Sequence, residues 1–334
     1  MRVSSSQVYR QVTDSLMRNL AEIMRLNTQV SSGKKINKPS DDPAGAARAL
    51  DYKVAIDAGE QYGKNVADAS NAIGFAENTL GSVSSALVRA KELALQAANG
   101  TQNASSRAAI SKEAAQLRDH LLSLANSRFG DGYVFSGFRT DVPAFDASLA
   151  YQGDSGTINV MVDRSVMISR NVTGSEAFGY ALSAPETVTI DGGKIAHYIP
   201  GSGTSVTVEI RAADDTTVLD SFSFDNAMQV TDLLSQALVN NDTTRISALM
   251  KPLDDAMGHV NDVRADLGAR LNRLDDQGKR LEETKFATQT ALSGVEDADI
   301  ASTVSDIAKA NAALQALQAS SAKILSQSLL DFLK

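Results

Sequence analysis

Apolar residues at both ends of the 334-residue chain recur every three or four positions in narrow stripes. The stripe near the N-terminus comprises Tyr9, Val12, Leu16, Leu20, Ile23 and Val30. The stripe near the C-terminus comprises Ile300, Val304, Ile307, Leu314, Leu317, Ile324, Leu325, Leu329 and Phe332. Such narrow stripes are typical of helices that pack against a single partner helix rather than on a broad core. We therefore expect the two ends to pair with each other or with copies of themselves.

Turn-forming residues divide the first hundred residues into two helices. The pattern predicts a helix from about residue 5 to residue 32, ended by Gly33 in the left-handed conformation. Residues 34–42 read as a polar loop, and Asp42 followed by Pro43 is typical of a helix start. The next helix carries an unbroken heptad pattern and ends at Asn99-Gly100; its apolar positions are Val66, Ala69, Ile73, Ala76, Leu80, Val83, Leu87, Ala90, Ala94 and Ala97.

A third helix follows a short polar loop at 101–106, and an antiparallel pair is the simplest arrangement. After residue 128 the apolar period changes from that of a helix to that of a strand. Asp131-Gly132 predicts a hairpin, and turns at 191–193, 201–203 and 214–215 separate further strands. The middle of the chain is therefore predicted to be rich in β-structure.

Helix is predicted again from Asp225-Asn226 to about Val239, and then along a longer apolar pattern between residues 249 and 281. Pro252 should kink that longer helix or mark its true start. Ser293-Gly294 is expected to break the helix before the C-terminal stripe.

This order of elements predicts an α+β fold, in which long N- and C-terminal helices pair into a coiled-coil or helical-bundle rod with a β-rich central insert. We expect three parts. Residues 1–40 with 293–334 form a terminal coiled-coil assembly domain that is disordered before assembly, because isolated helices of this length are marginal in water. Residues 41–180 with 226–292 form a helical bundle with β-hairpins, and 181–225 form a small β-rich outer domain. The alternative is that the ends pair within the monomer as an ordinary coiled coil.

The amino-acid composition argues against several classes of function. The chain has 40 Asp and Glu against 32 Lys and Arg, a formal charge of -8, which argues against binding nucleic acid. No apolar run is long enough to span a bilayer, and the N-terminus lacks the apolar core of a cleaved secretory signal. The chain has no cysteine, so disulfides and thiolate metal sites are excluded.

The sequence contains few candidate catalytic or metal-binding residues. His120, His197 and His259 stand apart, and none has the spacing of a metal ligand. The carboxylates of Glu296, Asp297 and Asp299 match no calcium-loop spacing and fit the start of a helix. We expect no enzymatic activity and no cofactor.

Several short motifs resemble the bacterial flagellin family. They occur in the expected order and lie near both ends: VSSGKKIN at 30–37, DDPAG at 41–45, KELALQAANGT at 91–101, LGARLNRL at 267–274 and EDAD at 296–299. Within the family, KPSDDP at 38–43 and YVFSGFRT at 133–140 are more similar to the proteins of the hook–filament junction than to filament flagellin.

The resemblance implies a structural protein of the extracellular flagellum, exported without a cleaved signal peptide. It implies a ring of identical subunits in which the two terminal stripes form the assembly interface. Hook-associated protein 1 would lie on the hook side and flagellin on the filament side, and an export chaperone would hold the C-terminal helix. No nucleic acid and no membrane insertion are expected.

The polar loop carries a second candidate contact. Lys35, Lys38, Asp41 and Asp42 are expected either to meet a neighbouring subunit or to form a solvated loop that caps the next helix. Two other functions stay open: filament flagellin itself, and a flagellar scaffold whose central insert is a binding module.

Overall fold

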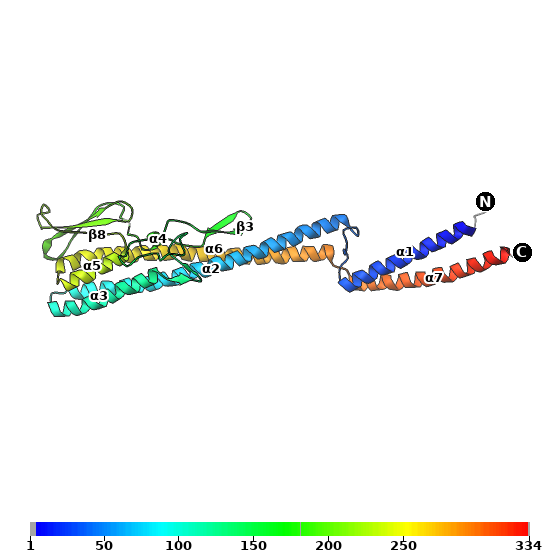
Figure 1. The fold of residues 1–334 in the computed structure, drawn as a ribbon, viewed down its shortest axis with the longest axis horizontal. Coiled ribbons are helices and arrows are strands. Elements are labelled where there is room, and N and C mark those ends of the chain that lie inside the picture. The colour runs from blue at the N-terminus through cyan, green and yellow to red at the C-terminus, as the bar shows by residue number, and fades with distance from the viewer. Residues whose placement is uncertain (1–4, 181, 333–334) are drawn as a thin grey trace. The chain divides into compact units, whose positions relative to one another are not determined.

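The computed structural model describes residues 5–180 and 182–332 (Figure 1). The helices are α1 (Ser5–Ser32), α2 (Pro43–Ala98), α3 (Ala104–Ala125), α4 (Gly174–Phe178), α5 (Ala227–Val239), α6 (Thr243–Glu296) and α7 (Ile300–Phe332). The strands are β1 (Arg128–Phe129), β2 (Gly132–Tyr133), β3 (Asn159–Asp163), β4 (Val166–Ser169), β5 (Glu186–Thr189), β6 (Ile195–Pro200), β7 (Val206–Arg211) and β8 (Val218–Phe224). The predicted α+β fold, with long terminal helices and a central β insert, is confirmed.

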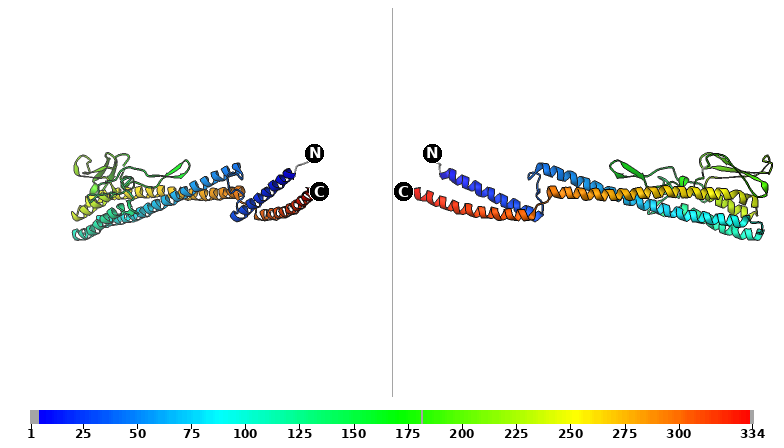
Figure 2. Two further views of the ribbon diagram at one scale, coloured as in Figure 1. Left: turned by 45° about the vertical axis from the view of Figure 1, so that its right-hand side comes forward. Right: turned by 180° about the vertical axis from the view of Figure 1, so that it is seen from behind.

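The chain forms two compact units, and α2 and α6 contribute to both. Unit 1 contains residues 1–61 and 281–334, and unit 2 contains residues 62–280. The expected terminal assembly domain, 1–40 with 293–334, falls inside unit 1, and the expected outer domain, 181–225, falls inside unit 2. In unit 1, α1 and α7 contact each other and run side by side in every view (Figures 1 and 2).

Unit 2 is built on the predicted heptad. All ten of its apolar positions between Val66 and Ala97 are buried, and Arg264 of α6 forms an ion pair with Glu77 on this stretch of α2. The next helix, α3, contacts α5, and its apolar edge is buried at Ile110, Ala114 and Leu121. The helix boundaries at Gly33, Pro43 and Ala98 lie where the turn residues predicted them.

Within residues 5–180 and 182–332, the β-structure consists of three antiparallel sheets. Strands β1 and β2 form a hairpin as expected, although its turn lies at Gly130-Asp131, one residue earlier than Asp131-Gly132. Strands β3 and β4 form a second hairpin, and the third sheet has the order β5-β6-β7-β8. Alternate residues of β7, namely Val206, Val208 and Ile210, are buried, so one face of this sheet belongs to the core of unit 2.

Pro252 lies inside α6, which begins at Thr243, so Pro252 does not start the helix. A proline has no N–H, and the carbonyl four residues earlier therefore loses its helical donor. That carbonyl belongs to Ala248, and the buried hydroxyl of Tyr198 on β6 donates to it at 2.7 Å. A tyrosine hydroxyl is protonated at neutral pH and can donate, and burial raises the pKa of Tyr198 further above its ordinary value. The central sheet thus supplies the hydrogen bond that α6 lacks.

The expected break at Ser293-Gly294 is also wrong by a few residues. Helix α6 continues to Glu296, and α7 begins at Ile300 after a three-residue connection. Asp299 caps α7, since its side chain accepts a hydrogen bond from the backbone N–H of Ser302 at 3.1 Å. A single glycine is tolerated inside a helix, and capping contacts decide where the helix ends.

A buried arginine closes the end of the helical bundle in unit 2. Arg107 of α3 is 5% exposed, and its guanidinium donates to the carbonyls of Ala97 and Asn99 at 2.7 and 3.3 Å. It also donates to Oδ1 of Asn241 at 2.7 Å, between α5 and α6. One side chain therefore ties the α2–α3 connection to the α5–α6 connection.

Within the described residues, no helix combines the length and the hydropathy that crossing a bilayer requires.

Candidate assembly surface

The contact between α1 and α7 follows a coiled-coil spacing. On α7, the described side chains that are not fully exposed step by four and three: Thr303, Ile307, Ala310, Leu314, Leu317 and Ser321. On α1, the matching series with the same steps is Val12, Leu16, Asn19, Ile23, Leu26 and Val30. This alternation keeps one face of each helix toward the other. We call these two series the terminal seam.

Half of the fourteen predicted interface residues lie in the terminal seam. Val12, Leu16, Ile23, Val30, Ile307, Leu314 and Leu317 all do. Leu20, Ile300 and Val304 lie off it and are 44, 44 and 51% exposed. Ile324, Leu325, Leu329 and Phe332 lie on α7, but outside the residues whose side chains the structure describes. The sequence pattern missed Leu26, which is 5% exposed, because it followed Leu20 instead of the step through Asn19.

Unit 1 leaves much of its apolar surface uncovered. Its large apolar side chains that stay exposed in the single chain are Tyr9, Met17, Leu20, Met24, Leu50, Val54, Phe286, Ile300 and Val304. They lie on all four helices of the unit, and Met24 and Phe286 are exposed by more than 70%. Exposed apolar side chains that gather in one patch are typical of protein–protein interaction surfaces, and we take those of unit 1 as the candidate surface.

A buried carboxylate joins the two connections of unit 1. Oε1 of Glu296 accepts from Nζ of Lys34 and of Lys53, both at 2.8 Å, and the Glu296 side chain is 9% exposed. Burial acts to raise the pKa of Glu296, but hydrogen bonds from the two lysines outweigh it and hold the pKa below its ordinary value. The backbone adds a bridge between Lys34 and Asp297. The α1–α2 loop is thereby fastened to the α6–α7 connection.

The four loop residues predicted to form an inter-subunit contact are all in this region. The Asp41 carboxylate accepts from the backbone N–H groups of Lys38 and Asn37, which lowers its pKa. Asp42 caps α2, since its Oδ1 accepts from the N–H of Gly45 at 2.9 Å. The Lys35 N–H donates to the Glu296 carbonyl at 2.6 Å. The capping role is thus confirmed for Asp42, and the inter-subunit role stays a prediction.

Two of the histidines have partners that the sequence did not reveal. Nε2 of His197 on β6 lies 2.5 Å from Oδ1 of Asp215 in the β7–β8 connection, and Nε2 of His259 lies 2.6 Å from the Glu176 carbonyl oxygen. No cluster of three or more His, Asp or Glu that could hold a metal occurs among the described residues.

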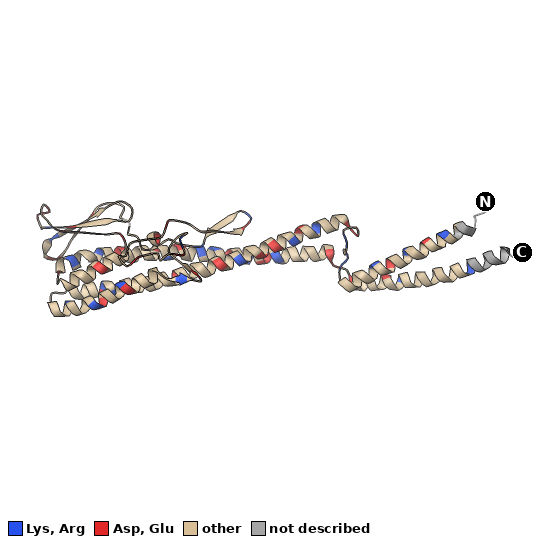
Figure 3. Ribbon diagram, viewed as in Figure 1, with Lys and Arg blue, Asp and Glu red and all other residues tan. Residues whose placement is uncertain are grey.

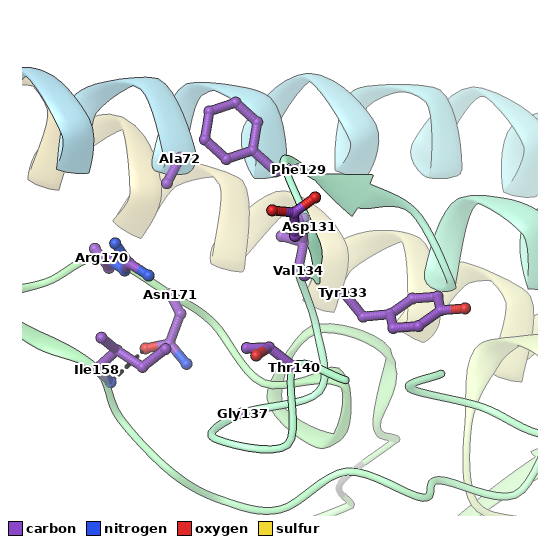
Figure 4. Close-up of a pocket in the computed structure, with 11 residues that line it drawn as sticks. Ala72, Phe129, Asp131, Tyr133, Val134, Gly137, Thr140, Ile158, Arg170 and Asn171 are labelled. Carbon is purple, nitrogen blue, oxygen red and sulfur yellow. Dashed lines mark hydrogen bonds between the residues drawn. The ribbon is translucent and has the colours of Figure 1, made fainter. Parts of the chain in front are cut away.

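The described cavity in unit 2 lies beside the β1–β2 hairpin (Figure 4). It measures about 250 Å³ and is lined by Phe129, Asp131, Tyr133, Thr140 and Arg170, among others. The lining holds one carboxylate and one guanidinium and has no nucleophile paired with a base, so this cavity offers no evident catalytic arrangement. The candidate site of this protein is therefore the surface of unit 1.

Both ends of the chain match family models. Residues 3–140 match the bacterial flagellin N-terminal helical region, and residues 250–333 match the bacterial flagellin C-terminal helical region. Together the two matches cover about two thirds of the chain.

The relatives agree with these matches. Flagellar hook-associated protein 3 of Salmonella typhimurium is 28% identical over 330 residues, covering 95% of this chain and 94% of that protein. Flagellin of Bacillus subtilis is 27% identical over 326 residues, covering 96% of this chain and 94% of that protein. The crystal structure of flagellar hook-associated protein 3 from Legionella pneumophila shares the fold, with a TM-score of 0.58 and 20% identity over 73% of this chain and 98% of that one. The paired terminal helices, the heptad on α2 and the two family matches together show that the chain belongs to the bacterial flagellin family, whose members are structural components of the flagellum, an extracellular appendage.

Proposed function

We propose that this protein forms the junction layer between the hook and the filament of the bacterial flagellum. Support comes from its similarity to hook-associated protein 3 along nearly the whole chain, and from the motifs at 38–43 and 133–140. The protein has no catalytic role in this proposal, and it acts by assembling through unit 1.

The observation that carries the proposal is the apolar surface of unit 1. A fully buried Val, Leu, Ile, Phe or Met side chain contributes about 1.5–3 kcal/mol relative to an exposed one. Unit 1 forgoes much of this contribution at eight such side chains, including Met24, Phe286 and Val304. Packing against neighbouring subunits would recover it, so a tubular layer would stabilise the terminal helices more than the single chain does.

Specific partners follow from the position of such a layer. Identical copies lie on either side within a ring, hook-associated protein 1 lies on the hook side, and flagellin lies on the filament side. In this proposal the pairing of α1 with α7 described above forms on assembly, and the ends (1–40 and 293–334) are largely disordered before it. Disorder suits passage through an export channel without a cleaved signal and capture of the C-terminal helix by a chaperone. In the assembly, Lys35, Lys38, Asp41 and Asp42 face a neighbouring copy.

Filament flagellin is the second candidate, favoured by the 27% identity to Bacillus subtilis flagellin over 96% of the chain. The two functions differ in self-polymerisation. A flagellin extends into long filaments from purified protein, whereas a junction protein adds only to a preformed end. A binding module in the central insert has less support, because the sheet is anchored to α6 through Tyr198 and an ion pair of Lys251 with Glu186.

The test is to delete the gene from the bacterium that encodes it and then restore it. We expect the deletion strain to complete its hooks and to release unpolymerised flagellin into the medium, and the intact gene to restore filaments. Leu317→Asp, which places a charge in the terminal seam, should fail to restore them although unit 2 still melts normally. Leu219→Asp is the matched control, since Leu219 is 51% exposed on β8 in unit 2. Normal filaments in the deletion strain would refute the proposal.

A further inference from the structure

The connection between α2 and α3 contains the only Asn-Gly pair in the sequence, Asn99-Gly100. Asn99, Gly100 and Thr101 are all exposed to solvent in a turn that follows the end of α2. An asparagine followed by glycine is prone to deamidation, because glycine has no side chain to hinder attack by its own backbone nitrogen on the asparagine carboxamide. The hydrogen bonds of this turn decide whether the fold restrains or assists that reaction.

The carboxamide of Asn99 is polarised by two donors. Its Oδ1 accepts from the backbone N–H of Thr101 and from the Thr101 hydroxyl, both at 3.1 Å. Attack of a nucleophile on Cγ places negative charge on this oxygen, and donors that are already in position stabilise such charge. The turn therefore makes Cγ of Asn99 a better electrophile than it is in an unfolded chain.

The nucleophile, the backbone nitrogen of Gly100, is assisted through its own peptide group. The carbonyl of that group belongs to Asn99, and it accepts from the N–H of Gln102 at 3.1 Å and from the guanidinium of Arg107 at 3.3 Å. Gly100 must lose its amide proton to attack, and the resulting negative charge is shared with this carbonyl oxygen. Two donors on the oxygen, one of them cationic, stabilise the charge. The Gly100 N–H donates to no acceptor in the described part of the chain, so its proton is free to leave.

We propose that Asn99 is a modification site, at which the folded turn promotes spontaneous deamidation with water as the reactant. The Gly100 nitrogen bonds to Cγ of Asn99 as its proton passes to solvent. The bond from Cγ to Nδ2 then breaks, Nδ2 takes up a proton and leaves as ammonia, and a succinimide ring remains. Water opens the ring at either carbonyl and gives aspartate, or isoaspartate in which the main chain runs through Cβ and Cγ. No oxidant or reductant is needed.

Either product finds donors for its new carboxylate. In aspartate the charge lies on the side chain, where Thr101 donates. In isoaspartate it includes the former backbone carbonyl oxygen of residue 99, to which Gln102 and Arg107 donate. Residues 93–106 carry no charged side chain, and Figure 3 shows the helix ends at this connection in tan, so no carboxylate within this stretch repels the new one. We therefore expect the modified chain to stay folded.

The test compares conversion in the folded full-length chain with conversion in a synthetic peptide of residues 92–107, at the same mildly alkaline pH and temperature. Trypsin releases the same fragment from the chain, because it cleaves after Lys91 and Arg107. Mass spectrometry reports the change from amide to acid, and isoaspartate methyltransferase labels the isoaspartate. We expect Asn99 to convert several-fold faster in the chain than in the peptide. Asn103 in the same fragment is the internal control and should stay an amide, since alanine follows it and its side chain caps α3.

Two variants separate the contribution of the fold from that of the Asn-Gly pair. Gly100→Ala should slow conversion in chain and peptide alike, and the structure accommodates it, since a Cβ there meets no atom within 4 Å and the φ of Gly100 is not positive. Thr101→Val removes the hydroxyl donor and keeps the N–H, so it should slow conversion a few-fold in the chain only. Conversion in the chain no faster than in the peptide, or an equal effect of Thr101→Val on both, would overturn the inference. Either result leaves the proposed function intact.

Discussion

The two units of this protein bury their apolar side chains very differently. Among the described residues, fifty apolar side chains are buried, and only Leu26, Ile36 and Ala49 of these belong to unit 1. The exposed large apolar side chains, in contrast, are divided equally, although unit 1 is about half the size of unit 2. Unit 2 therefore has a core of its own, whereas unit 1 buries few apolar side chains, and in our proposal neighbouring copies complete its core. The difference predicts that one kind of mutation will affect stability in unit 2 and assembly in unit 1.

Truncation of a buried leucine is expected to give the largest difference between the two units. Leu87→Ala removes a side chain with no exposed surface from unit 2, and we expect a loss of about 2–5 kcal/mol in the free energy of unfolding. Leu26→Ala should leave the main thermal transition, which we assign to unit 2, within about 0.5 kcal/mol, because in our proposal α1 is disordered in the free chain. It should nevertheless reduce incorporation onto hooks. Calorimetry and a hook-binding assay measure the two effects. Equal destabilisation by both variants would remove the distinction between the units.

Removal of an arginine side chain from each unit tests the same difference in stability. Arg107→Ala leaves the carbonyls of Ala97 and Asn99 without their donor inside unit 2, and we expect a cost of about 2–4 kcal/mol in denaturant titration. Arg25→Ala in unit 1 breaks only an exposed pair with Glu22, and its cost should stay below about 1 kcal/mol. If Arg107→Ala changes the free energy of unfolding only slightly, water must donate the hydrogen bonds to these two carbonyls instead.

A double-mutant cycle tests whether the sheet compensates for the proline in α6. Tyr198→Phe should cost about 1–3 kcal/mol, since the buried carbonyl of Ala248 then has no partner. In a Pro252→Ala background the helix supplies its own N–H to that carbonyl, so the same substitution should cost clearly less. Identical costs in both backgrounds would show that the hydroxyl does not serve this purpose.

The smallest expected effect concerns pH. The pKa of Glu296 is lowered in the folded chain, so its ion pairs stabilise unit 1 fully above the ordinary pKa of 4.5, and that stability is lost as the pH falls through the lower folded value. In chains assembled on hooks, Glu296→Gln should therefore reduce the loss of stability of unit 1 at low pH, and it should leave the pH dependence of the stability of unit 2 unchanged. If the stability of unit 1 falls at low pH in this variant as it does in the unmodified chain, Glu296 is not the group that titrates.

Sequence patterns predicted the parts of the fold that depend on local repetition. The heptad from Val66 to Ala97 was found because each of its positions is apolar and buried in the same chain. The cap at Asp42 and the stop at Gly33 were found because those residues act within a few positions of themselves.

Contacts between distant residues could not be predicted in the same way. Lys34 and Glu296 form an ion pair although they are 262 residues apart, and nothing in the sequence around either residue identifies the other as its partner. Pro252 indicated an interrupted helix from the sequence alone. Only the fold shows that the Tyr198 hydroxyl lies at the Ala248 carbonyl, which the proline leaves without a helical donor. Asn19 was overlooked as a seam position because a polar residue breaks an apolar pattern, although it keeps the spacing.

Hydrogen exchange, compared between the free chain and the chain assembled on hooks, tests the central claim most directly. The account predicts that amides of α1 and of α7 around Leu314 and Leu317 exchange rapidly in the free chain and slowly after assembly, while those of α2 from Val66 to Ala97 are protected in both states. Strong protection of the α7 amides in the free chain, equal to that of α2, would contradict it.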